Sequence, residues 1–217
     1  MRVLAIDVGC GTSDVLLWDS GSEEENQTHM IIPSGTEVVA AEIGRATAEE
    51  RPVVFTGPLM GGGPSGGAMR RHISRGLAFY ATAPAAQSFN DDLEAVAAMG
   101  VTLVPLRDVA SLVDGGAVLV RSGDLRFPEL LEALRLVGEE AALDGCALAV
   151  QDHGQAGPGV SDRTFRFEMM SDTLARSRHL SSFFRTPDEL PGYLTRMRAT
   201  ADLMSVGTPL IVGDTGP

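Results

Sequence analysis

The chain has 217 residues, of which 44% are hydrophobic, enough for the core of one large domain or two small ones. Its formal net charge of −12 argues against nucleic acid and anionic membranes as partners, because both bind a positively charged surface. No apolar run approaches the roughly 20 residues of a membrane span, and the N-terminus does not resemble a signal peptide, so we expect a cytoplasmic protein.

The chain opens with two apolar segments, residues 3–6 and 15–18, which predict the strands of an antiparallel β-hairpin. The turn between them consists of Gly9, Cys10, Gly11 and Thr12, with Asp7 before it and Asp14 after it. Glycines allow successive backbone N–H groups to approach an anion, and a nearby carboxylate can hold Mg²⁺. The hairpin therefore predicts a phosphate-binding loop with its metal-site acid. The alternative is an ordinary hairpin with solvated acids.

Helices and strands alternate after the hairpin. Further strands are expected at residues 29–32, 52–56, 77–82, 101–105, 117–121, 146–151 and 209–212, and helices at 36–50, 68–75, 90–99 and 128–140. The sequence Thr-Pro-Asp-Glu at 186–189 predicts the capped start of a last helix, which restarts at Pro191 and reaches about residue 204. This order indicates an α/β fold with a mixed sheet and helices on both faces. Since no linker or repeat is visible, we expect one domain over residues 1–217.

The longest glycine cluster contains a literal Gly-x-Gly-x-x-Gly (Gly61, Gly63, Gly66) between a strand and a helix, which is typical of a dinucleotide site. Pro64 interrupts that turn, and the next strand lacks the acid that would hold a ribose. A substrate-side loop or lid over residues 57–67 and a plain connector are the other interpretations. The basic residues that follow, Arg70, Arg71, His72 and Arg75, either meet an anionic substrate or form a solvated helix face.

Asp152 lies where a strand meets a glycine-rich loop, the position at which α/β proteins expose their chemistry. It is a candidate general base, oriented by Gln151 or His153. Alternatively, Asp152 caps its loop by accepting hydrogen bonds from nearby backbone N–H groups. Arg163 and Arg166, beyond this loop, could contact phosphate or pair with the surplus acids.

The chain ends with an apolar strand followed by Gly213, Asp214, Thr215 and Gly216. This ending and the opening DVGCGTSD resemble, in the same order, the two phosphate loops of the actin-like ATPase superfamily of sugar kinases, heat-shock chaperones and actin. The resemblance implies that Asp214 complements Asp7 around Mg²⁺ or the attacking water, and that Thr215 and Gly216 offer donors to the phosphates. It also implies a second half of the domain after Pro217.

Two further stretches, TGPLMGGGPSGGAMRRHISRG and AVQDHGQAGPGVSDRTFRF, are similar to a prokaryotic family of unknown function labelled as a pyruvate formate-lyase activating enzyme. The resemblance implies a ribonuclease-H-like, actin-like ATPase fold that binds ATP and Mg²⁺. The expected activity is ATP hydrolysis or phosphoryl transfer to an unknown substrate or protein partner. A non-enzymatic nucleotide sensor or scaffold and, less favoured, a Rossmann-type oxidoreductase are the alternatives.

The lysine, cysteine and histidine content excludes several kinds of catalytic and metal site. All 17 basic residues are arginine, so no lysine is available to contact phosphate or act as a base. The two cysteines, Cys10 and Cys146, and the four histidines are scattered, and they predict neither a disulfide framework nor a zinc site. Radical-type activating enzymes hold an iron–sulfur cluster with closely spaced cysteines. This chain lacks that spacing, and Cys10 lies in the expected phosphate turn.

Overall fold

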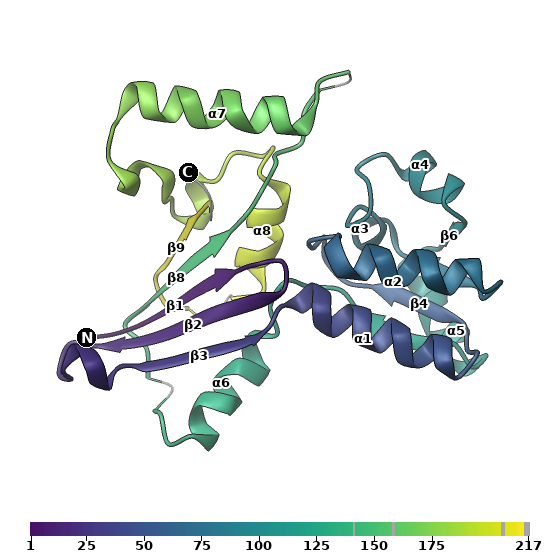
Figure 1. The fold of residues 1–217 in the computed structure, drawn as a ribbon, viewed down its shortest axis with the longest axis horizontal. Coiled ribbons are helices and arrows are strands. Elements are labelled where there is room, and N and C mark those ends of the chain that lie inside the picture. The colour runs from purple at the N-terminus through teal and green to yellow at the C-terminus, as the bar shows by residue number, and fades with distance from the viewer. Residues whose placement is uncertain (141, 158, 205–206, 215–217) are drawn as a thin grey trace. The chain divides into compact units, whose positions relative to one another are not determined.

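The computed structural model describes residues 1–140, 142–157, 159–204 and 207–214, and the chain divides into two compact units (Figure 1). Unit 1 comprises Met1–Ile32 and Leu125–Pro217, and unit 2 comprises the intervening Pro33–Asp124. Each unit has its own β-sheet and its own hydrophobic core. We expected one domain because the sequence contains no visible linker, so this division is seen only in the structure.

The sheet of unit 1 is mixed and begins with the expected hairpin. Its strands lie in the order β3-β2-β1-β8-β9, with bounds β1 Arg2–Val8, β2 Thr12–Asp19, β3 Thr28–Pro33, β8 Gly145–Val150 and β9 Leu210–Gly213. Strand β1 is antiparallel to β2 and parallel to β8, and β8 is parallel to β9. The predictions of an α/β class, a mixed sheet and an opening antiparallel hairpin are confirmed.

One face of this sheet forms the core of unit 1. Every second residue of the strands points to this face and packs against α6 (Phe127–Leu136) and α8 (Thr195–Asp202). These core residues include Leu4, Ile6, Val15, Leu148 and Val212. The alternating strand residues of the opposite face include Leu16, Trp18, Ile31 and Ile211, which keep 36–63% of their surface exposed. We expected helices on both faces, but in unit 1 the core-forming helices lie on one.

The long segment between β8 and β9 contains α7 (Asp162–Arg176), two 3-10 turns, η3 (Leu180–Phe183) and η4 (Pro187–Glu189), and α8; another 3-10 turn, η1, spans Glu24–Asn26. The capping box predicted at Thr186 and Glu189 is present. It starts only the short η4 turn, however, and α8 begins at Thr195, so the expected helix is shorter than predicted.

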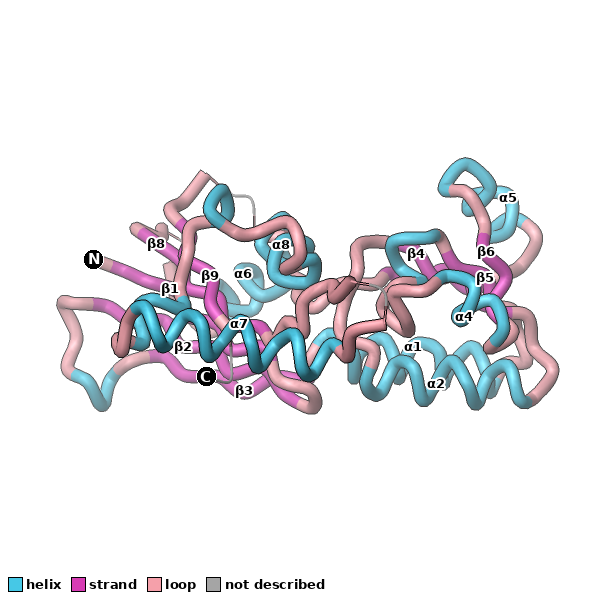
Figure 2. Tube along the Cα trace, turned by 90° about the horizontal axis from the view of Figure 1, so that it is seen from above, coloured by secondary structure: helices cyan, strands magenta, loops and turns pink. Residues whose placement is uncertain are grey.

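Unit 2 has a four-stranded parallel sheet in the order β6-β5-β4-β7, with bounds β4 Val53–Thr56, β5 Phe79–Ala81, β6 Val101–Leu103 and β7 Val118–Arg121. Its helical elements are α1 Gly35–Ala48, α2 Gly63–Ser74, α3 Ala83–Ala86, α4 Leu93–Ala98, η2 Leu106–Asp108 and α5 Val109–Asp114. Helices α1 and α2 run side by side (Figure 2). The core between helices and sheet includes Ile43, Phe55, Met69, Phe79 and Val120.

Part of the glycine cluster is helical. Gly63, Gly66 and Gly67 lie in α2, which begins about five residues earlier than predicted. Before it, the N–H of Gly61 donates to the Asp124 carboxylate at 3.0 Å, and a Cβ on Gly62 would lie 2.0 Å from the Ser88 carbonyl oxygen. Residues 57–67 therefore form a packed strand-to-helix connection, and a role as a substrate-side loop or lid stays a prediction.

Candidate functional site

The three mutually parallel strands of unit 1 end at the same edge of the sheet. The register aligns Asp7 of β1 with Ala149 of β8, and Ala149 with Gly213 of β9. Directly beyond this edge lie the Gly9–Thr12 turn, Asp152 and Asp214. The structure thus brings the predicted segments to one sheet edge, where ligands of α/β sheets commonly bind. Thr215 and Gly216 lie outside the described residues.

The hairpin turn uses its two glycines differently. The N–H of Gly9 donates to the Thr12 carbonyl oxygen at 3.0 Å, and a Cβ on Gly9 would lie 2.6 Å from that oxygen, so the turn itself requires glycine there. A Cβ on Gly11 would meet no described atom within 4 Å. The turn therefore does not need glycine at position 11, and it leaves an open, exposed space beside that backbone.

Two acids face each other across the hairpin. Asp7 and Asp14 are directly paired residues of β1 and β2, and the Nε2 atom of His29 on β3 lies 3.5 Å from the Asp14 carboxylate. Partial burial is the larger cause that raises the pKa of Asp7, and repulsion from the Asp14 carboxylate raises it further. Because like charges directly opposite each other destabilise a sheet, a cation between these carboxylates would relieve the repulsion.

A depression of about 260 Å³ adjoins this acid pair on the exposed face of the sheet. Small side chains of the central strands, including Ala5 and Ala149, line it together with Leu16 and Phe184. Phe184 follows η3 and packs on Gly213, where a Cβ would lie 2.7 Å from the ring. Asp7, Asp14 and His29 are thus the polar members of an otherwise apolar surface.

Asp152 links β8 to α8. Its carboxylate is 3% exposed and accepts hydrogen bonds from the N–H groups of Gly154 and Met197, both at 2.8 Å. Burial raises the pKa of Asp152, while these two hydrogen bonds and the nearby Arg196 lower it. The arrangement is the one expected if Asp152 caps its loop; its role as a general base stays a prediction.

Asp214 forms a buried ion pair with α7. The Arg166 guanidinium donates to both carboxylate oxygens, with Nε–Oδ2 3.1 Å and Nη2–Oδ1 2.7 Å, and the two side chains are 13% and 5% exposed. Arg166 thus pairs with an acid, one of the two roles that the sequence left open. Asp7 and Asp214 line different depressions, so the structure does not show both carboxylates facing one pocket.

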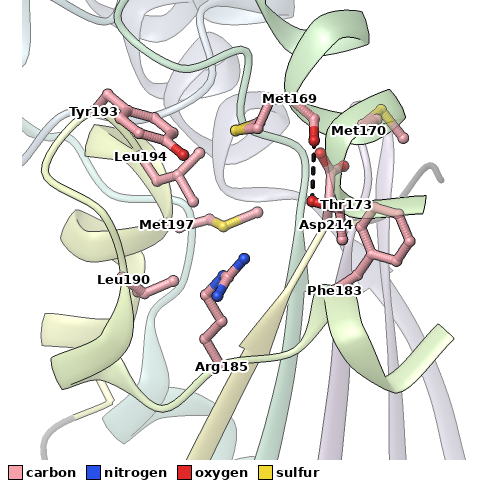
Figure 3. A pocket seen from close by; sticks show the side chains of 10 residues that line it. All are labelled: Met169, Met170, Thr173, Phe183, Arg185, Leu190, Tyr193, Leu194, Met197 and Asp214. Carbon is pink, nitrogen blue, oxygen red and sulfur yellow. Dashed lines mark hydrogen bonds between the residues drawn. The ribbon is translucent and has the colours of Figure 1, made fainter. Parts of the chain in front are cut away.

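Asp214 instead lines a methionine-rich pocket between α7 and α8 (Figure 3). Arg185 also lines it, and the backbone of Arg185 pairs with Val212 through N–H···O bonds of 2.9 and 2.8 Å. Arg185 was not among the predicted site residues. The available signal was weak: a single arginine directly after two phenylalanines.

Residues 60–217 match the protein family described as "Putative pyruvate format-lyase activating enzyme (DUF1786)". The chain belongs to this family. The match does not include the opening hairpin with Asp7 and the Gly9–Thr12 turn. No curated protein matches the chain.

The family description suggests an activating enzyme, but the cysteines do not fit a cysteine-held cluster. Leu4 pairs with Cys146 at one end of β1, whereas Cys10 follows the other end, and Cys146 is buried. In the described part of the chain, no group of three or more histidine, cysteine or acidic residues lies close enough to hold a metal ion. Nor does any helix of the described residues have the length and apolar character to cross a membrane.

Proposed function

We propose that unit 1 binds ATP with Mg²⁺ at the carboxyl edge of its sheet and uses it for hydrolysis or phosphoryl transfer. The observation that carries this proposal is the convergence of the Gly9–Thr12 turn, Asp152 and Asp214 at one edge of parallel strands. Ligands of open α/β sheets bind outside such edges.

The hairpin turn is suited to a phosphate group. The open space beside Gly11 is what a closely approaching anion requires, and any Cβ there would fill it. The N–H of Gly9 donates within the turn. We assign Cys10, Gly11 and Thr12 to the phosphates because the open space lies beside Gly11. The Thr12 hydroxyl adds a donor.

The acid pair is suited to a hydrated divalent cation. Asp7 is exposed and lies opposite Asp14, and Mg²⁺ is commonly held by one or two carboxylates and several waters. When bound, Mg²⁺ would neutralise charge on the phosphates. Since Arg166 already holds Asp214, we assign Asp7 and Asp14 to the cation and expect Asp214 to act by positioning Arg166.

The topology of unit 1 supports placement of the fold among ribonuclease-H-like, actin-like ATPases. Its sheet has an antiparallel hairpin followed in space by β8 and β9, both parallel to β1, and unit 2 is inserted after β3. The resemblance of the two terminal motifs to phosphate loops points to the same superfamily. In such proteins catalysis rests on positioning and charge stabilisation more than on covalent chemistry.

A thermal-unfolding series tests ATP binding. ATP·Mg²⁺ at a hundred times its Kd should stabilise the wild-type chain by about 2.7 kcal/mol, whereas Asp7→Asn should respond much less. Because this substitution removes a like-charge repulsion, it should not lower the stability of the unliganded protein. The matched control is Asp172→Asn, an exposed acid on α7.

Other outcomes of the same series favour the alternatives. Stabilisation by NAD and not by ATP would overturn the proposal in favour of a dinucleotide-binding protein. Stabilisation by ATP·Mg²⁺ without phosphate release, with or without added substrates, would indicate a nucleotide sensor or scaffold instead of an enzyme. An equal response of Asp7→Asn and wild type would exclude the acid pair as the cation site.

A further inference from the structure

The methionine-rich pocket of unit 1 contains a cationic side chain that the proposed nucleotide site does not use. Met169 and Met170 of α7, Met197 of α8, Phe183 and Tyr193 supply half of the lining residues, and Arg185 enters from below (Figure 3). The volume of this pocket is about 30 Å³. That volume admits a group of a few atoms without rearrangement.

Backbone pairing fixes the position of Arg185. Its N–H donates to the Val212 carbonyl oxygen at 2.9 Å, and its own carbonyl oxygen accepts from the Val212 N–H at 2.8 Å. Figure 3 shows the guanidinium directed into the middle of the lining side chains. Pairing with β9 therefore fixes the backbone from which this cation reaches the pocket.

No carboxylate of the described residues forms an ion pair with Arg185. Asp214 shares the pocket, but its two oxygens are held by Arg166 at 3.1 and 2.7 Å. Glu189 is near enough to feel the charge of Arg185, yet its carboxylate accepts from the N–H and the hydroxyl of Thr186 at 3.0 and 2.9 Å and lies in solvent. Among the described residues, Arg185 is thus a positive charge of this pocket with no carboxylate in contact with it.

We propose that this pocket binds a small apolar monocarboxylate, with its carboxylate on Arg185 and its tail among the methionines. A guanidinium keeps its charge at any physiological pH and offers planar paired donors that match a carboxylate. Thioether side chains are flexible and polarisable, so Met169 and Met197 can turn to admit a tail longer than the closed space holds. Arg166 neutralises Asp214 and so removes the repulsion that an incoming anion would otherwise meet.

Tyr193 and Phe183 set the shape of the apolar end. The Tyr193 ring stands edge-on to Phe165, with ring centres 5.3 Å apart, and Phe165 belongs to α7. This contact holds the Tyr193 ring beside the pocket. Flat or unbranched tails should therefore be preferred over bulky branched ones. The site does not depend on nucleotide binding at the hairpin, so either proposal can fail without the other.

The test is an NMR titration of the full chain carrying ¹³C-methyl methionine. Three of the nine methionines line the pocket, and the other six serve as internal controls. The probes are hexanoate, hexylamine, 1-hexanol and inorganic phosphate, each at millimolar concentration. Hexanoate should shift the resonances of Met169, Met170 and Met197, and Arg185→Gln should weaken this binding by at least about ten-fold, as expected on losing a charged hydrogen bond. Arg178→Gln, at an exposed arginine just after α7, should bind as wild type does.

Each other outcome overturns the proposal. Absence of any hexanoate response in the wild-type protein refutes the site, and this readout does not depend on a variant that folds. Equal shifts with hexylamine or 1-hexanol show that Arg185 does not select an anion. A response to phosphate without one to hexanoate identifies an oxyanion site of another class. If Arg185→Gln keeps the wild-type thermal transition and also keeps full hexanoate affinity, Arg185 is not the recognition group.

Discussion

The backbone N–H of Met197 donates to the Asp152 carboxylate at 2.8 Å, which ties the end of β8 to the first turn of α8. The other oxygen of the same carboxylate accepts from the Gly154 N–H. A carboxylate at a helix N-terminus satisfies an otherwise unpaired donor and interacts favourably with the helix dipole. One buried side chain therefore holds the start of the loop after β8 and connects it to α8.

Replacing Asp152 by alanine should destabilise unit 1 by about 1–3 kcal/mol, because two buried N–H groups would lose their acceptor. Asp152→Asn should cost less, since one oxygen remains to accept. Chemical denaturation measures both. If Asp152 is instead a general base, Asp152→Asn will abolish ATP turnover while stability hardly changes, and that pattern would contradict a purely structural role.

Gly213 should not tolerate a methyl group. A Cβ there would lie 2.7 Å from the Phe184 ring, so Gly213→Ala should cost about 1–3 kcal/mol through overpacking. The matched control is Gly192→Ala, where the added Cβ meets no described atom within 4 Å. The double variant with Phe184→Leu should recover part of the loss. Equal stability of Gly213→Ala and Gly192→Ala would show that the ring is free to move aside.

The ion pair of Arg166 with Asp214 should be costly to break on one side. Asp214→Asn removes a nearly buried negative charge and leaves the Arg166 charge without its carboxylate, so we expect a loss of roughly 3–5 kcal/mol in urea unfolding. The loss of unfolding free energy in the double variant Arg166→Met, Asp214→Leu should be smaller than the sum of the losses in the two single variants. Additive losses would mean that the pair contributes no coupling energy.

His72 should make unit 2 sensitive to acid. Its ring is fully buried, with Nδ1 2.8 Å from the Thr47 hydroxyl and Nε2 3.2 Å from the Ala78 carbonyl oxygen. Burial lowers the pKa of His72 below its usual 6.5, partly offset by the bond to Ala78. The unfolded chain therefore binds a proton more readily than the native state. The free energy of unfolding should be highest above pH 6.5 and should decrease as the pH falls from 6.5 toward the pKa of His72 in the folded protein.

The check is the urea-unfolding free energy measured across this pH range. The unfolding free energy of His72→Phe should change less with pH than that of the wild type. This comparison does not depend on the stability of the variant at neutral pH. A wild-type profile that is flat between pH 7.5 and 5.5 would contradict the prediction.

The local features of the fold were predictable because their signals are local. The hairpin, most strands and the capping box at Thr186 follow from alternation, turn chemistry and capping over a few residues. The short helix α5 was not predicted. Helix α2 begins inside a glycine cluster whose composition is typical of a loop, because packing against Ser88 and Asp124 stabilises the start of this helix.

The site was only partly predictable. Asp7 and Asp14 were found because they flank one turn. The partner of Asp214 lies 48 positions earlier in the chain, and that of Asp152 lies 45 positions later, so neither pairing has a local signal. The pocket position of Arg185 depends on its pairing with Val212, which connects separate segments and has no pattern in the sequence.

The central claim is that the hairpin turn binds the phosphates of ATP, and a calorimetric titration of Gly11→Ala tests it most directly. The added Cβ meets no described atom within 4 Å, so the variant should unfold as wild type does. The account predicts that ATP·Mg²⁺ binds the wild-type chain and binds Gly11→Ala at least about ten-fold more weakly, because the methyl group occupies the space of the phosphate. Equal affinity of the two proteins, or no binding to the wild type, would contradict it.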